Sequence, residues 1–161
     1  MPCRRNCLGL LTLSPLGALA LLDSLAARGL QAGTGMTPQE LRARFDRFAD
    51  EVIRLCRREA TDPLRTRLLE QLQDAATSAA ANYRAACRAQ TKPAFIAKLS
   101  ITLEETDEAG GWLQRLSNAG LGDPTTVADL LQEAGELAAI INASRETARG
   151  RRHTGQGPNR R

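Results

Sequence analysis

Residues 37–56 read TPQELRARFDRFADEVIRLC, and this stretch predicts an amphipathic helix with a defined start. The Thr37 hydroxyl can accept a hydrogen bond from a free amide of the first turn, Pro38 needs no amide partner there, and Glu40 can reach back to the cap. The apolar residues that follow step by four and three along one face: Leu41, Phe45, Phe48, Val52 and Leu55. The sequence therefore predicts a helix from Thr37 to near Ala60.

The same start signal recurs three times, at Asp62-Pro63, Thr91-Lys92-Pro93 and Asp123-Pro124, and the predicted helices end near residues 88–90, at 118 and at 149. The predicted inner positions are Leu64, Leu68, Leu72, Ala75, Ala79, Tyr83 and Ala86, then Phe95, Leu99, Leu103, Thr106, Leu113 and Leu116, then Val127, Leu130, Ala134, Leu137 and Ile141. Connections of a few residues leave no room for a crossover. The predicted fold is all-α, an antiparallel up-and-down four-helix bundle over residues 36–149.

The two ends of the chain differ from this middle part. Residues 1–35 contain an apolar run from Leu8 to Leu22, broken by glycine and proline, which is too short for a membrane span of about twenty residues. Three interpretations remain: a mis-assigned start with translation beginning at Met36, which we favour, a signal peptide, or a disordered arm. Residues 150–161 hold no apolar side chain to bury, so we expect a disordered basic tail.

The net charge of +4 is concentrated in these ends. Residues 36–149 hold fifteen basic and seventeen acidic side chains, so the predicted domain is close to neutral. A strong generic polyanion binder carries its positive charge on the domain itself. The charge count therefore argues against a nucleic-acid partner as the first choice.

The residues give no sign of catalysis, a metal or a cofactor. The only histidine is His153 in the tail, so neither a di-iron site nor a base for Ser78, Ser100 or a cysteine can be assembled in the bundle. Cys56 and Cys87 fall on apolar helix faces and are predicted to be buried free thiols, and no Cys-x-x-Cys pair occurs. We expect a non-enzymatic protein of the reducing cytoplasm, without a membrane-bound segment.

Charge is uneven around the connection between the second and third helices. Four basic residues lie near it, Arg84, Arg88, Lys92 and Lys98, and four acidic residues follow, Glu104, Glu105, Asp107 and Glu108. Two interpretations stay open: the acidic residues pair with arginines of a neighbouring helix, or the acidic band meets the basic end of another subunit.

Three segments carry a resemblance to a known family. Residues 78–86 read SAAANYRAA, residues 89–99 read AQTKPAFIAKL, and residues 105–113 read ETDEAGGWL. They resemble the motif of bacterial four-helix bundle proteins encoded in intervening sequences of large-subunit ribosomal RNA genes. The matching motif residues include Asn82, Tyr83, Arg84, Phe95, Lys98, Glu105, Glu108 and Trp112. The chain departs from the motif at Ala85, which stands for Glu, at Glu104, where Lys is common, and at residues 109–111, which include two glycines.

The resemblance implies a homopentameric ring with no assigned activity, and the motif residues are expected in the core or at subunit contacts. It also extends to the accessory variability proteins of diversity-generating retroelements, which bind a reverse transcriptase and RNA. Two hypotheses follow. The first is a non-enzymatic assembly or interaction module, and the second is a nucleic-acid-binding accessory protein that contacts RNA or DNA through Arg84, Arg88, Lys92 and Lys98.

Overall fold

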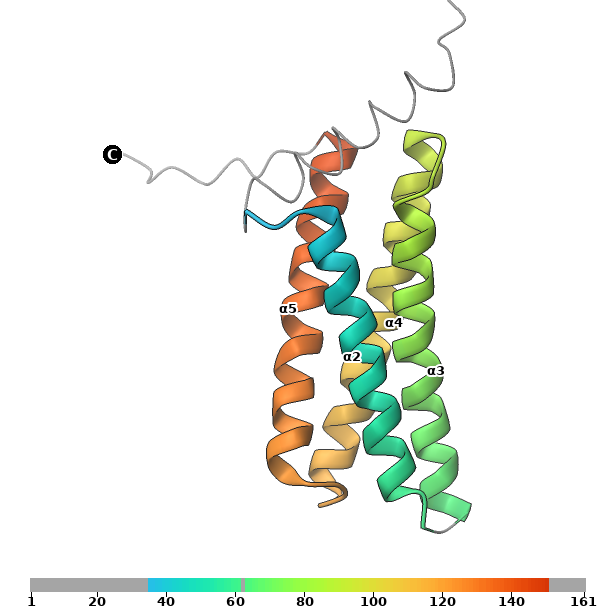
Figure 1. The fold of residues 1–161 in the computed structure, drawn as a ribbon, viewed down its shortest axis with the longest axis vertical. Helices are drawn as coiled ribbons and strands as arrows, with labels where there is room; N and C mark the ends of the chain where they lie inside the picture. The colour runs from blue at the N-terminus through green and yellow to red at the C-terminus, as the bar shows by residue number, and fades with distance from the viewer. Residues whose placement is uncertain (1–34, 62, 151–161) are drawn as a thin grey trace, which may run out of the picture.

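The computed structural model describes residues 35–61 and 63–150, in which four helices run up and down beside one another (Figure 1). They are α2 (Pro38–Glu59), α3 (Pro63–Ala86), α4 (Lys92–Asn118) and α5 (Pro124–Arg149). The predicted extension 1–35 and tail 150–161 lie outside the described residues, except for Gly35 and Gly150. The predicted all-α four-helix bundle is confirmed for the described part of the chain.

The helix starts follow the predicted capping signals. In α2 the Glu40 amide donates to the Thr37 hydroxyl at 3.2 Å, and the Glu40 carboxylate accepts from the Thr37 amide at 2.7 Å, which completes the capping box. The Asp123 carboxylate caps α5 by accepting from the Thr126 amide at 2.8 Å. All four helices therefore begin within one residue of the positions that the sequence predicts.

The end of α3 differs from the prediction. The helix stops at Ala86 rather than at residues 88–90, because residues 87–91 are needed to reverse the chain before the extended Thr91 cap of α4. Turn hydrogen bonds join the Arg88 amide to the Ala85 carbonyl at 3.1 Å and the Ala89 amide to the Ala86 carbonyl at 3.0 Å. Cys87 consequently starts the turn and is exposed, so its predicted burial is wrong, whereas Cys56 is buried as predicted.

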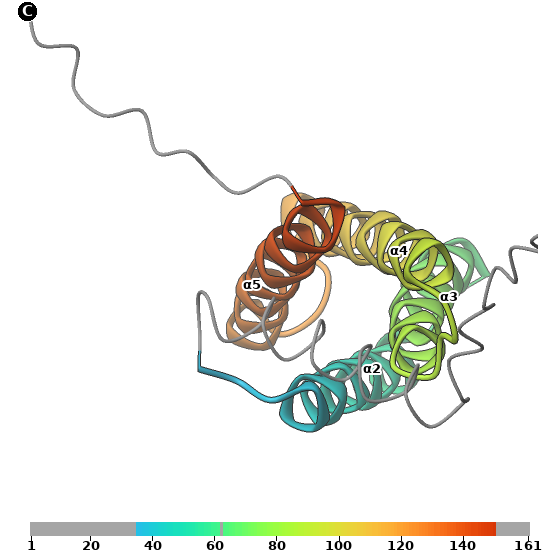
Figure 2. The ribbon, with the colours of Figure 1, turned by 90° about the horizontal axis from the view of Figure 1, so that it is seen from above.

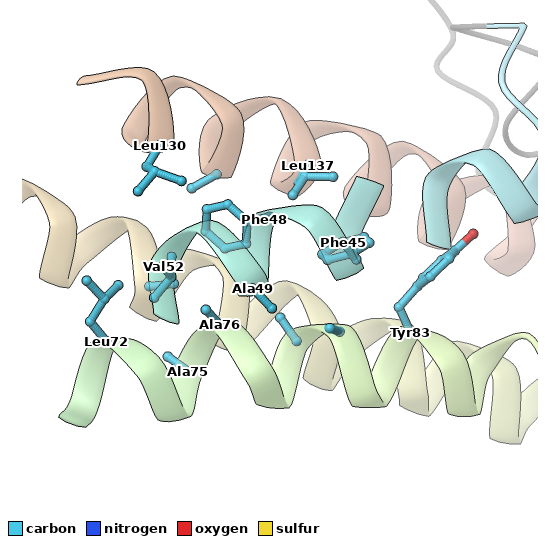
Figure 3. Close-up of a cluster of buried hydrophobic side chains, with 14 of the residues drawn as sticks. Phe45, Phe48, Ala49, Val52, Leu72, Ala75, Ala76, Tyr83, Leu130 and Leu137 are labelled. Carbon is cyan, nitrogen blue, oxygen red and sulfur yellow. The ribbon is translucent and has the colours of Figure 1, made fainter. Parts of the chain in front are cut away.

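Viewed along the bundle axis, the helices surround one core in the order α2, α3, α4, α5 (Figure 2). The inner faces meet along four seams between neighbouring helices, and the seam between α2 and α5 is the least extensive of the four. Figure 3 shows part of this core, where Phe45 and Phe48 of α2 lie among the alanines of α3 and the leucines of α5. Small residues on α3 let its backbone approach the aromatic rings closely.

Most predicted inner positions are buried, and the exceptions concern the register of α3 and α4. Leu69 is buried where Leu68 was predicted, and Thr102 and Ala109 are buried while Leu103 is only half-buried. The side chain of Leu64 lies outside the described part. Thr102 is tolerated inside because its hydroxyl donates to the Lys98 carbonyl at 2.9 Å, which leaves no unpaired polar group.

Candidate functional site

The motif residues lie on α3, α4 and the turn between them, but they do not form one cluster. Asn82 and Lys98 meet across the seam between the two helices. Tyr83 and Phe95 are buried in the core, whereas Trp112 lies near the far end of α4. The motif therefore combines a helix-helix link, core packing and a surface group.

The link between α3 and α4 is made by Asn82. Its amide nitrogen donates to the Ser78 carbonyl at 3.0 Å and to the Ser78 hydroxyl at 3.3 Å, and its amide oxygen accepts from the Lys98 ammonium at 3.0 Å. Asn82 and Lys98 are half-buried, which strengthens a hydrogen bond that includes a charged donor. This arrangement fixes one register between the helices and occupies the Lys98 ammonium.

Tyr83 is only 2% exposed and stacks on Phe45 of α2, with ring centroids 5.1 Å apart (Figure 3). Burial raises the pKa of its phenol above the ordinary value, so the ring stays neutral. Because the ring is enclosed between helices, it cannot stack on a nucleic-acid base without unfolding. Tyr83 is a packing residue of the bundle.

Trp112 is the centre of a surface cluster on α4. Its indole nitrogen donates to the Glu108 carboxylate at 3.1 Å, and the Arg115 guanidinium lies over the ring at 4.8 Å from the centroid. Arg115 also donates to the Gly111 carbonyl at 2.9 Å. A half-exposed tryptophan with an arginine on its face is the combination that interface hot spots favour.

Of the four acidic residues on α4, only Glu108 takes part in the Trp112 cluster. Within the described ranges, Glu104, Glu105 and Asp107 form no ion pair, so the first of the two open interpretations, pairing with arginines of a neighbouring helix, is not found there. Carboxylates three and four residues apart on one helix repel one another. The acidic band on α4 is therefore uncompensated within the described part of the chain.

The four residues predicted to contact nucleic acid fall into two groups. Arg84 is 3.7 Å from the Asp46 carboxylate, and Lys98 is held by Asn82. Arg88 and Lys92 are exposed at the α3–α4 turn and form no ion pair with any described residue. Only the second group presents unoccupied positive charge.

Sequence reasoning missed the strongest polar contact, which joins α2 to α5. The Arg44 guanidinium donates to both oxygens of Glu133 at 2.6 Å and also contacts Glu136. The hydrogen bonds to Glu133 raise the pKa of Arg44 above its ordinary value, so the guanidinium stays charged. No sequence signal pairs residues 89 positions apart, so only the packed bundle reveals this contact.

The described residues offer no assembled catalytic or metal site. The Ser100 hydroxyl donates to the Ile96 carbonyl, and burial raises the pKa of the Cys56 thiol to about 11, which disfavours the reactive thiolate. No group of three or more His, Cys, Asp or Glu side chains in residues 35–61 and 63–150 is placed to hold a metal ion. Likewise, no helix in this described part is long and apolar enough to cross a membrane.

Comparisons with known proteins identify the family. Residues 41–143 match the model of the 23S rRNA-intervening sequence protein family. Among solved structures, a protein of unknown function from the S23 ribosomal protein family of Bacteroides thetaiotaomicron superposes with a TM-score of 0.64 at 22% identity. The alignment covers 69% of this chain and 99% of that one, and it supports the fold. No curated protein matches the chain significantly. The family match spans most of the bundle and includes the whole motif, so the chain belongs to the 23S rRNA-intervening sequence protein family.

Proposed function

We propose that the protein is a non-enzymatic interaction module that assembles with copies of itself. The observation that carries this proposal is the composition of the outer face of α5. Eight of the ten exposed residues of α2 are charged, but only three of the twelve exposed residues of α5 are. A helix that faces water along its length is normally rich in charge, so this contrast favours a covered face on α5.

The uncharged residues of α5 lie where another helix could approach closely. Ala128, Gly135, Ala139 and Ala143 are exposed, and an added Cβ at Gly135 would meet no atom within 4 Å. The Trp112–Arg115 cluster of α4 supplies a second, separate anchor for a partner. The family resemblance adds the expected stoichiometry, a ring of five copies.

A pair of alanines tests the proposal. Ala139 of α5 and Ala43 of α2 are both exposed, so an arginine at either position should leave the fold intact. We expect wild-type protein and Ala43→Arg to elute as an oligomer by light scattering at micromolar concentration, whereas Ala139→Arg should dissociate. A monomeric wild-type protein, or equal assembly of both variants, contradicts the proposal.

A second function, that of a nucleic-acid-binding accessory protein, is favoured by a different observation. Arg84, Arg88 and Lys92 gather at one end of the bundle, around the α3–α4 turn. The likeness to retroelement accessory proteins adds a reverse transcriptase as a candidate partner. A mobility shift of RNA at low salt supports this function, and the absence of a shift there excludes it, because phosphate contacts are strongest at low salt.

We further propose a cytoplasmic location for the protein. Cys56 is a buried thiol outside any disulfide, and a reducing compartment keeps such thiols unoxidised.

A further inference from the structure

Three chain segments that are distant in sequence converge at one end of the bundle. They are the start of α2, the α3–α4 connection with the helix ends beside it, and the end of α5 (Figure 1). We define the basic end as the half of the bundle formed by residues 35–48, 75–103 and 138–150. The up-and-down topology alone brings these segments together.

This convergence separates charge along the bundle axis. The basic end holds nine basic and three acidic side chains, whereas the rest of the described chain holds six basic and thirteen acidic side chains. Although Arg44 is matched by Glu133 and Glu136 of the other half, a near-neutral total conceals a positive end. A charge count along the sequence shows only the part of it around the α3–α4 connection. Such a separation attracts an anionic partner to one end only.

The acidic groups of the basic end do not neutralise it. Asp46 lies between two arginines, 3.8 Å from Arg42 and 3.7 Å from Arg84. Glu40 is engaged in the α2 cap, and its pKa is lowered by the Thr37 amide. Glu146 pairs with Arg145 and Arg149 on its own helix. Arg88 and Lys92 therefore remain uncompensated by any described residue, and both are exposed.

The side chains at the basic end also restrict the kind of contact that it can make with a nucleic acid. Tyr83 and Phe95 are 2% and 5% exposed, so the aromatic residues here are unavailable for base stacking. Single-stranded nucleic acids are bound largely through such stacking, whereas duplex RNA is bound through its backbone and shape. Arginine outnumbers lysine here, and its planar fork suits phosphate oxygens.

We propose that the basic end binds the phosphate backbone of duplex RNA without reading its bases, through Arg88 and Lys92 with support from Arg84. This inference rests on the second function above and names its surface, its nucleic-acid form and its mode of contact. It also differs from the sequence prediction, because Lys98 is occupied by Asn82 and contributes little.

The test compares two charge reversals in the full-length protein. Arg88→Glu/Lys92→Glu alters the basic end, and Arg57→Glu/Arg67→Glu makes the same charge change in the other half, at exposed arginines that form no ion pair with a described residue. Fluorescence anisotropy with a labelled duplex RNA is followed across a salt range of about 50 to 200 mM. We expect the first variant to lose affinity at least about tenfold and its salt slope to fall by about two, and the second to change less than about threefold.

Binding measurements with other polyanions show whether duplex RNA is the preferred ligand. A duplex of scrambled sequence should bind equally, and single-stranded RNA and polyglutamate should bind more weakly. Equal losses in the two variants, preference for the single strand, or equal binding of polyglutamate overturns the inference. If wild-type protein binds no RNA, the second function fails as well, whereas RNA binding that ignores Arg88 and Lys92 overturns this inference alone.

Folding controls accompany these variants. Circular dichroism should show that each double variant retains its helix content, because all four residues are exposed. Glutamate is favourable near the start of α4 and only slightly unfavourable at Arg57, in the last turn of α2. The milder Arg88→Gln/Lys92→Gln variant should show a smaller loss in the same direction, and unchanged affinity in this variant also counts against the inference.

Discussion

At the scale of single residues, the family motif serves structure more than surface chemistry. Tyr83 fills the space between α2 and α3 against Phe45, and Asn82 holds Lys98 across the next seam. A buried aromatic ring and a half-buried amide both specify which helices pack together and at what register. The adjacent motif positions 82 and 83 thus tie α3 to two different neighbours.

Replacing Tyr83 by alanine should destabilise the bundle by about 3–5 kcal/mol, because a buried ring is lost and a cavity remains beside Phe45. Urea unfolding followed by circular dichroism measures the change. Tyr83→Phe keeps the ring and should cost less than about 1.5 kcal/mol. A loss below about 1 kcal/mol for the alanine variant contradicts tight packing at this position.

At the scale of elements, α4 continues unbroken through Gly110 and Gly111. An added Cβ at Gly110 would lie 3.7 Å from the Ala134 Cβ of α5, which is ordinary contact. Glycine is therefore not required there by close packing. It costs α4 conformational entropy that the neighbouring helices offset.

Gly110→Ala should accordingly stabilise the protein by about 0.5–1 kcal/mol, seen as a higher urea midpoint. Gly122→Ala is the matched control and should destabilise, because Gly122 has a φ of +80° and its added Cβ would approach the Val127 Cγ2 to 3.0 Å. A destabilising Gly110→Ala would show that α4 and α5 pack more closely than these distances indicate.

At the scale of the whole molecule, the seam between α2 and α5 depends on charge. Arg44 of α2 contacts Glu133 and Glu136 of α5, across the least extensive of the four seams between neighbouring helices. The hydrogen bond from Gln132 and the contact with Arg44 lower the pKa of Glu136, and the caps of α2 and α5 lower those of Glu40 and Asp123. These lowered pKa values link the stability of the bundle to acid.

Folding stability should be steady from about pH 7 to pH 5 and should then fall with pH. The folded pKa values lie below the ordinary values of 4.5 for Glu40 and Glu136 and 3.8 for Asp123, so the unfolded chain takes up protons first as the solution is acidified. Urea unfolding across this range measures the effect. Arg44→Met should lower stability near neutrality and make the acid loss shallower, and a flat profile to about pH 3 contradicts the prediction.

The sequence by itself determined the four helices, because caps, prolines and apolar steps act over a few residues and are written locally. It also carried the motif that marks the family. Its errors, at Leu68, Leu103, Cys87 and the end of α3, arose where packing or chain reversal chose between neighbouring residues. The tertiary structure decided which motif residues meet, joined Arg44 to Glu133, and gathered three separated segments into one basic end. These features depend on distances between helices, and only the folded bundle sets those distances.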